Sequence, residues 1–295
     1  MKPLIIEIID ARRIGELVTA ARIFGAAPDL LALGAGDIPG TYPAAYRAGE
    51  AVAANVVSAA AELIDSQGYD VILLSATTVG AEIAGRLAVR LKAPVLSEII
   101  AISPDMTVKR PLYGGKAVAE YKIAQTPVVL TVRRKYFESA DLSGTTAATA
   151  LAITESPVRF LSEEAVKTEG VPLEDAEVIV SGGRGIGTAE NFGMLREMAG
   201  IMNAAVGASR GAVDEGWAAP TLQIGQTGNI VAPSVYFAVG ISGASQHLAG
   251  IANAKCVVAI NKDEEANIFK RARFGIVADY RQVLPALTRA LKEER

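Results

Sequence analysis

Short apolar runs alternate with alanine-rich segments of helical periodicity along most of the chain, and this alternation restricts the fold more than any other feature. In the first half we expect helices at 14–24, 44–64 and 79–91, and strands at 4–9, 30–33, 71–74, 95–102 and 128–132. Strands and helices that alternate in this way predict a mainly parallel sheet with helices on its faces. The expected fold class is therefore α/β.

The pattern changes twice further along. Residues 108–113 and 117–123 flank Gly114-Gly115, which is a hairpin signal. Residues 155–176 lose regular periodicity and carry charges, so we expect a linker there and a domain boundary near residue 172. A second alternation follows, with helices expected at about 190–202 and from 282, and strands at 177–180, 204–207, 235–239, 257–260 and 276–277. Two α/β domains are predicted, 1–172 and 173–295.

Composition excludes several classes of protein. With 29 basic and 32 acidic residues the net charge is -3, and there is no basic block, so a nucleic-acid partner is not expected. The single cysteine, Cys256, excludes an internal disulfide, and no metal site is expected. The apolar stretch at the N-terminus is too short for a signal peptide or a membrane span. We expect a protein of the cytoplasm or another reducing compartment, without membrane insertion.

The only histidine, His247, follows the apolar run 235–241 and a turn at Ser242-Gly243, and it stands in the first turn of a predicted helix. Helix N-termini favour anions, and an imidazole can hold or release a proton near neutral pH. A lone histidine at such a place is more often a satisfied surface or core residue. Its position alone leaves both interpretations open.

Two further segments follow predicted strands. The sequence SGGRGIGTAENF (181–192) comes close to two phosphate-binding patterns, but Thr188 stands where one needs lysine and the other a third glycine. This loop binds a phosphate-containing ligand or is a structural turn, and Arg184 pairs with a pyrophosphate or is simply solvated. In VGASRG (206–211), Arg210 reaches an electron-rich ring or forms a salt bridge with Asp214 or Glu215.

A third segment, QIGQTGNIVAP (223–233), gathers amide and hydroxyl side chains in a short stretch. Such groups suit the edge of a heteroaromatic ring, and they suit a plain turn equally well.

Taken in order, SGGRG, VGASR, QIGQTG, SVYFAVGISGASQHLAG, VVAIN and GIVAD resemble the FAD-binding domain of the electron transfer flavoprotein alpha subunit. The resemblance runs from about 177 to 285, and the first 150 residues fit the family's N-terminal domain in length and α/β pattern. It implies a Rossmann-like fold for the second domain, one FAD in this chain, and a heterodimer with a beta subunit that carries AMP or a second FAD.

Carried over residue by residue, the resemblance places Arg210 near the isoalloxazine, Gln226 and Thr227 around its N5, and His247 close to the pyrimidine carbonyl. Negative charge on the N1 and O2 side of a reduced flavin would be stabilised there. The implied FAD contacts are Arg184, Ser209, Arg210, Ile224, Gly225, Gln226, Thr227, Ser242, Gly243, Ala244, Ser245, Gln246 and His247, with Asn261, Asp279 and Tyr280 along the pyrophosphate and adenosine.

The implied function is that of an electron carrier without a substrate site of its own. It accepts electrons from flavin dehydrogenases, such as the acyl-CoA dehydrogenases of fatty acid oxidation, and passes them toward a quinone-linked oxidoreductase. The alternatives are an electron-bifurcating variant that uses NADH, with a second FAD in the beta subunit, and a regulatory module that binds an adenine nucleotide without redox chemistry. Glu264, Asn267 and Arg273 depart from the family pattern and question the loop conformation near the adenosine end.

Overall fold

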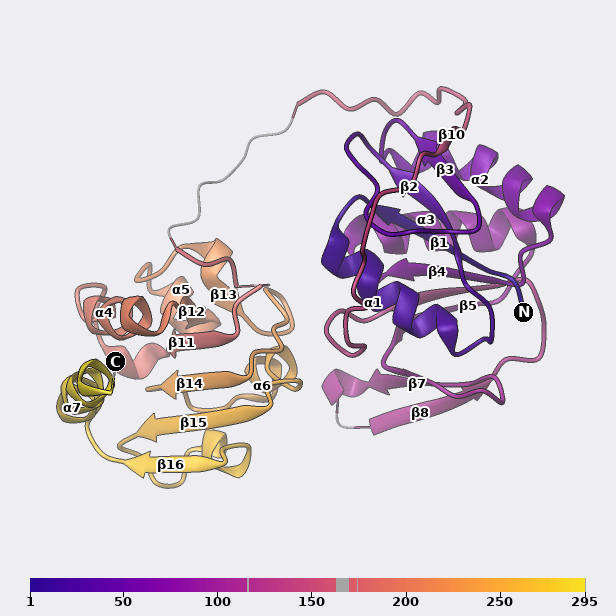
Figure 1. The fold of residues 1–295 in the computed structure, drawn as a ribbon. Helices are drawn as coiled ribbons and strands as arrows, with labels where there is room; N and C mark the ends of the chain where they lie inside the picture. The colour runs from indigo at the N-terminus through magenta and orange to yellow at the C-terminus, as the bar shows by residue number, and fades with distance from the viewer. Residues whose placement is uncertain (116, 163–169, 174, 295) are drawn as a thin grey trace. The chain divides into compact units, whose positions relative to one another are not determined.

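The computed structural model describes residues 1–115, 117–162, 170–173 and 175–294. The chain divides into two compact units, 1–163 and 164–295, and each is described here by itself (Figure 1). The predicted linker at 155–176 lies partly outside the described residues, and its other residues belong to no helix or strand. The boundary near residue 172 stays a prediction.

Unit 1 is built on seven parallel strands in the order β10-β3-β2-β1-β4-β9-β5, which confirms the expected parallel α/β architecture. Its helices are α1 (Ala11–Arg22), α2 (Ala53–Gln67) and α3 (Thr78–Leu91). Its strands are β1 (Pro3–Ile8), β2 (Asp29–Leu33), β3 (Ala45–Ala48), β4 (Val71–Ser75), β5 (Val95–Ile99), β9 (Val128–Val132) and β10 (Thr149–Ala150).

Both faces of this sheet are covered by helices and are apolar. Successive side chains of a strand point to opposite faces, so neighbouring residues of one strand pack in different cores. On β1, Leu4 and Ile6 pack in the core that α2 and α3 cover, whereas Ile5 packs in the core that α1 covers. All three side chains are fully or almost fully buried. The strands of unit 1 therefore read as continuous hydrophobic runs rather than alternating ones.

The predicted helix 44–64 is wrong in its first part, because residues 45–48 form strand β3 beside β2. The buried Asp29 carboxylate fixes the entry to this strand by accepting a hydrogen bond from the Ala44 amide (2.9 Å). Helix α2 begins only at Ala53. Alanine-rich composition does not distinguish a strand from a helix here, whereas the parallel pairing with β2 does.

The predicted strand 95–102 is divided between two sheets. Glu98 adopts a left-handed φ of 61°, and its amide donates to Thr131 Oγ1 (3.0 Å) instead of continuing the ladder. Residues beyond it form β6 (Ala101–Ile102), which pairs antiparallel with β7 (Thr107–Leu112), itself paired with β8 (Ala117–Lys122). The predicted hairpin is confirmed, and Tyr113–Gly115 form a short 3₁₀ turn, η1, within it.

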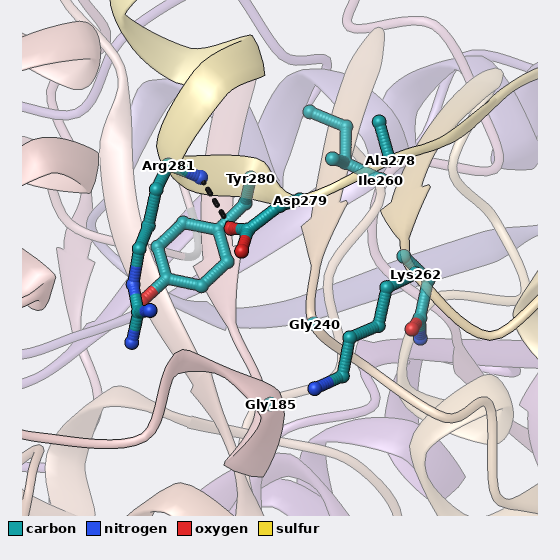
Figure 2. Close-up of a pocket in the computed structure, with 9 residues that line it drawn as sticks. Gly185, Gly240, Ile260, Lys262, Ala278, Asp279, Tyr280 and Arg281 are labelled. Carbon is teal, nitrogen blue, oxygen red and sulfur yellow. Dashed lines mark hydrogen bonds between the residues drawn. The ribbon is translucent and has the colours of Figure 1, made fainter.

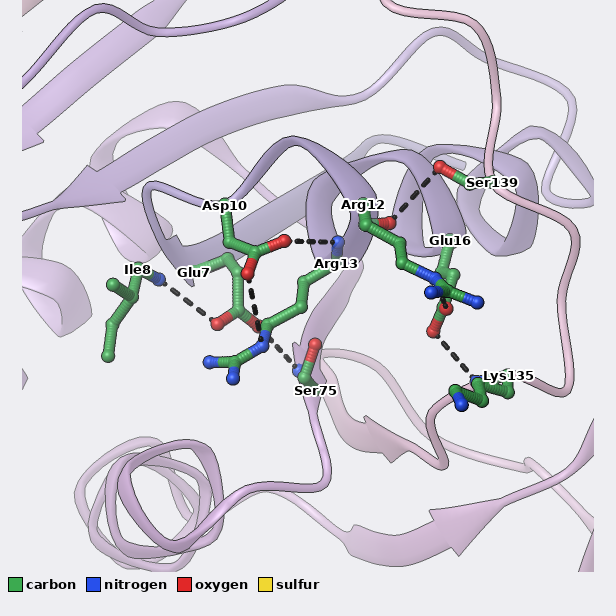
Figure 3. A network of polar contacts seen from close by, with 9 residues as sticks. All are labelled: Glu7, Ile8, Asp10, Arg12, Arg13, Glu16, Ser75, Lys135 and Ser139. Carbon is green, nitrogen blue, oxygen red and sulfur yellow. Dashed lines mark hydrogen bonds and ion pairs between the residues drawn. The ribbon is translucent and has the colours of Figure 1, made fainter. Parts of the chain in front are cut away.

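A buried carboxylate lies at the carboxyl end of β1 (Figure 3). Glu7 accepts hydrogen bonds from the amides of Ser75 (3.0 Å), at the end of β4, and of Ile8 (3.1 Å). Burial raises the pKa of Glu7, against these hydrogen bonds. Because the strand order reverses between β1 and β4, this carboxylate fills the point where parallel sheets commonly bind ligands.

Unit 2 is built on six parallel strands in the order β13-β12-β11-β14-β15-β16. These are β11 (Val178–Gly182), β12 (Ala205–Ser209), β13 (Gln223–Ile224), β14 (Val235–Val239), β15 (Cys256–Asn261) and β16 (Phe274–Val277). The helices are α4 (Phe192–Met202), α5 (Arg210–Asp214), α6 (Ser245–Gly250) and α7 (Tyr280–Glu293), with 3₁₀ turns η2 (Arg184–Ile186), η3 (Pro220–Leu222) and η4 (Asn267–Lys270).

Successive side chains of β14 pack alternately into two hydrophobic cores, one on each face of the sheet. Phe237 and Val239 face the core formed with α4 and α7. Tyr236 and Ala238 face the opposite core, which includes Ile251 just beyond α6. Tyr236 is fully buried, so its hydroxyl group must find a partner inside the protein.

Among the described residues, no helix combines the length and the apolar composition that a membrane crossing requires.

A close packing contact in unit 1 gives a stability prediction. A Cβ at Gly80 would lie 2.0 Å from the Ser75 carbonyl oxygen, whereas a Cβ at Gly85, on the same helix, would meet nothing within 4 Å. We expect Gly80→Ala to lower the free energy of unfolding by about 1–3 kcal/mol and Gly85→Ala to raise it by about 0.5–1 kcal/mol. Urea unfolding followed by circular dichroism measures both, and equal effects would contradict the packing.

Candidate functional site

The carboxyl ends of all six strands of unit 2 lie at one edge of the sheet, because every pairing is parallel. The strand order reverses between β11 and β14, since β12 and β13 lie on one side of β11 and β14 to β16 on the other. Open parallel sheets bind ligands in the crevice at such a reversal. The residues singled out from the sequence follow these six strand ends.

A cavity of about 610 Å³ lies at this edge, a size typical of small-molecule and cofactor sites. It brings together twelve of the sixteen predicted FAD contacts: Arg184, Ser209, Arg210, Ile224, Gly225, Gln226, Thr227, Ser242, Ala244, Gln246, His247 and Asn261. Gly243, Ser245, Asp279 and Tyr280 are not among its lining residues. The cavity also includes Gly185, Gly211, Gln223, Gly240, Ile241 and Asp263, which are not among the predicted FAD contacts.

Asp279 and Tyr280 instead line a smaller adjoining cavity of about 70 Å³, which shares Gly185, Gly240 and Asn261 with the larger one (Figure 2). The Lys262 side chain extends into it. Asp279 caps α7 by accepting from the Arg281 amide (2.9 Å), and the Tyr280 hydroxyl donates to the Ile186 carbonyl (2.6 Å). Both side chains therefore have structural partners in addition to lining the cavity.

The glycine-rich loop after β11 packs against the loop after β14. The Gly183 amide donates to the Val239 carbonyl (2.8 Å), and the Gly185 amide donates to the Gly240 carbonyl (3.0 Å). A Cβ at Gly183 would lie 2.2 Å from the Gly240 oxygen. These two amides are already hydrogen-bonded within the protein, so the glycines permit a close backbone crossing, and neither of the two amides is free to bind a phosphate.

Two arginines at the cavity differ in their contacts. The Arg210 Nε lies 3.4 Å from the Asp214 carboxylate. This salt bridge is one of the two alternatives that the sequence left open for Arg210, the other being contact with an electron-rich ring. Both side chains are well exposed, so the pair contributes little to stability. Arg184 is exposed, and within the described part of the chain it has no ion-pair partner. Arg184 therefore offers an unpaired guanidinium, and Arg210 a weakly held one.

The loop after β13 is fastened to α6 through the backbone. The Gln226 amide donates to the Gln246 carbonyl (2.8 Å), and a Cβ at Gly250 would lie 2.5 Å from the Gly225 nitrogen. The Thr227 hydroxyl accepts from Gln223 Nε2 (3.0 Å) and keeps its own proton available. The segment is thus a close-packed turn that also presents amide and hydroxyl groups to the cavity.

His247 lies in a different environment from the exposed residues before it in α6. Its side chain is 6% exposed, its Nε2 lies 3.0 Å from the Tyr236 hydroxyl oxygen, and its Nδ1 is buried without a hydrogen bond. Burial lowers the pKa of His247 to about 4, and the nearby Ile224 carbonyl only partly opposes this, without the geometry of a hydrogen bond to Nδ1. With this pKa the ring is neutral at pH 7, and its charge does not change near neutral pH.

The loop that departs from the family pattern is nevertheless well held. Asn261 Oδ1 accepts from the Asp263 amide (3.1 Å), and the Ile268 amide donates to the Ser242 carbonyl (3.1 Å). A Cβ at Gly243 would lie 2.3 Å from that same Ile268 nitrogen. The absence of a side chain at Gly243 therefore permits this close packing, and side-chain and backbone hydrogen bonds hold the turn.

Comparison with known proteins gives the family. Residues 172–252 match the family model of the electron transfer flavoprotein FAD-binding domain, and residues 44–158 match that of the electron transfer flavoprotein domain. Electron transfer flavoprotein subunit alpha of Pseudomonas aeruginosa is 44% identical over 80% of this chain and 77% of its own length. The chain belongs to the electron transfer flavoprotein alpha subunit family.

Two other alpha subunits agree with this assignment. That of Paracoccus denitrificans is 42% identical over 82% of this chain and 78% of its own length, and that of Mycobacterium leprae is 36% identical over 95% and 93%. The resemblance seen in the sequence is thus confirmed, and the match to the FAD-binding domain supports FAD as the cofactor. That match ends at residue 252, before Asn261, Asp279 and Tyr280.

The lining residues that sequence reasoning missed share one signal. Gly240 directly follows β14, and Asp263 follows β15 by two positions. Once the strands are expected to be parallel, the residues at each carboxyl end are candidates by position alone. Lys262 could have been found in the same way, since it is the first residue after β15.

The lowered pKa of His247 predicts an acid-dependent loss of stability. As the pH falls below 6.5, the unfolded chain binds a proton that the folded chain refuses until about pH 4, so the free energy of unfolding decreases in this window. At about pH 5 this contribution is about 2 kcal/mol. We expect His247→Gln to remove it. Urea unfolding at about pH 7 and pH 5, followed by fluorescence of the single Trp217, measures the difference; identical pH dependence in both proteins would contradict the burial.

Proposed function

We propose that this chain binds one FAD in the larger cavity and carries electrons as the alpha subunit of a heterodimeric electron transfer flavoprotein. The observation that carries the proposal is the cavity at the strand-order reversal, whose lining includes the buried His247, the weakly paired Arg210 and Arg184, for which the described residues offer no ion-pair partner. Donors and cations of this kind suit a ligand with an electron-rich ring and phosphate groups.

In this proposal some of the described residues contact the flavin ring and others contact the phosphates and the adenosine. Around the ring, Gln226, Thr227 and His247 supply hydrogen-bonding groups, and Arg210 supplies positive charge. Toward the phosphates, Arg184 and Lys262 supply charge, because the glycine-loop amides are already bonded. Asn261, Asp279 and Tyr280 line the pyrophosphate and adenosine end in this proposal, and Gly243 and Ser245 belong to the segment 242–247, which wraps the flavin and phosphate region. Bound FAD would supply the redox chemistry, and the protein tunes it.

The proposal extends to partners. A beta subunit that carries AMP or a second FAD completes the heterodimer, flavin dehydrogenases such as acyl-CoA dehydrogenases donate electrons, and a quinone-linked oxidoreductase accepts them. The bifurcating alternative, which uses NADH, requires the second flavin in the beta subunit. A count of flavins and adenine nucleotides in the purified complex therefore separates the two.

The decisive experiment is to co-express the chain with its beta subunit and to record the visible spectrum and the bound nucleotides. We expect a yellow complex with one FAD held by this chain. A colourless complex that fails to take up added FAD but retains an adenine nucleotide would favour the regulatory module without redox chemistry and overturn the proposal.

The Arg210–Asp214 pair allows a matched test. Replacing Arg210 with Gln removes a positive charge beside the proposed ring, so we expect the flavin midpoint potential to fall by the equivalent of about 1 kcal/mol. Asp214→Asn keeps that charge and removes its competitor, so the potential is not expected to fall. Spectroelectrochemical titration of the complex measures both, and a similar fall in the two variants would exclude a charge effect from Arg210.

A further inference from the structure

The fully buried hydroxyl of Tyr236 has one hydrogen-bond partner in the described part of the chain, and that partner is the only histidine. The Tyr236 oxygen lies 3.0 Å from Nε2 of His247, and the two rings are tilted by 52° with centroids 6.1 Å apart. The Ser181 hydroxyl, also fully buried, opposes the rise in the pKa of Tyr236 that burial causes, which is the effect of a donor, but it makes no hydrogen bond of acceptable geometry in the described part of the chain. The phenol proton therefore has Nε2 as its available acceptor.

This arrangement determines which nitrogen of the neutral imidazole carries the proton. If Nε2 carried it, Tyr236 would have to accept, and its own buried O–H would remain without an acceptor, which is costly. If Tyr236 donates, Nε2 is the acceptor and Nδ1 carries the proton. The Ile224 carbonyl opposes the lowering of the pKa of His247, but Nδ1 has no hydrogen bond of acceptable geometry in the described part of the chain. Tyr236 is thus the neighbour that selects the tautomer.

Tyr236 reaches this position through strand register. It points to the face of the sheet that α6 covers, because it alternates with Val235 and Phe237 along β14. His247 lies eleven residues later, in α6, and also lines the larger cavity. A residue that does not line the cavity thereby controls one that does.

We propose that Tyr236 is a positioning residue: it holds His247, which lines the larger cavity, as a neutral ring in the Nδ1–H tautomer and in one orientation. A ring fixed in this way gives the flavin of the proposed function a wall of constant shape and polarity, and this last step rests on that proposed function. Tyr236 itself does not touch the cofactor.

The chain suits a direct test, because labelling with ¹⁵N-histidine gives a single imidazole. The full chain, purified through a tag without histidine and combined with unlabelled beta subunit, gives a two-bond ¹⁵N–¹H spectrum in which the two tautomers have different patterns. We expect the Nδ1–H pattern in the wild type. An Nε2–H pattern, or rapid averaging of the two, overturns the proposal without any substitution.

Tyr236→Phe removes only the hydroxyl, and Tyr69→Phe is its matched control, since Tyr69 is also buried and donates to Asp29 Oδ2 (2.6 Å) in unit 1. We expect that His247 exchanges between its two neutral tautomers in Tyr236→Phe and that FAD binding weakens about threefold to tenfold. Tyr69→Phe is expected to change neither the tautomer nor FAD binding. An unchanged tautomer in folded Tyr236→Phe contradicts the positioning role. A wild-type chain that shows the fixed tautomer but binds no FAD contradicts the proposed function and leaves the role of Tyr236 intact.

Discussion

The backbone of Gly185 lies directly against the backbone of Gly240, and the shape of the candidate site depends on that contact. Gly240 adopts a left-handed φ of 62°, and a Cβ there would lie 2.9 Å from the Gly185 carbonyl carbon. The contact joins the loops that follow β11 and β14 at the strand-order reversal, since the amides of Gly183 and Gly185 donate to the carbonyls of Val239 and Gly240. Arg184 is left exposed beside the cavity, and the turn at Ser242 is directed toward α6. A side chain on any of these glycines would separate the two loops that form the floor of the cavity.

Above this floor the site combines one buried polar pair with an exposed polar rim. His247 and Tyr236 share a hydrogen bond inside the core, whereas Gln226, Thr227 and Gln246 remain accessible. The buried pair gives a fixed geometry, because neither ring can move without losing its hydrogen bond. The rim residues can adjust to a ligand at smaller cost. Precision and adaptability are thus provided by different residues of one cavity.

Sequence reasoning predicted the parallel α/β architecture and most of the cavity, because a parallel sheet brings all strand ends to one edge. It failed where pairing between distant segments overrides local composition. Residues 45–48 are alanine-rich but pair with β2, and Glu98 divides one apolar run between two sheets. The neutral state of His247 could not be predicted either, because it depends on how deeply the folded chain buries the ring. The motif located the histidine, and burial determined its chemistry.

The carboxylate of Glu7 has a consequence for the chain as a whole. Both units place a strand-order reversal at the carboxyl edge of a parallel sheet, but in unit 1 Glu7 bonds to the amides of Ile8 and Ser75 at that place. A phosphate at that place would meet an acidic side chain, and the backbone amides that could have bound the phosphate already donate to this side chain. The same architecture therefore occurs twice in one polypeptide, once with a cavity at the strand-order reversal and once with that place filled by a carboxyl group of the chain itself.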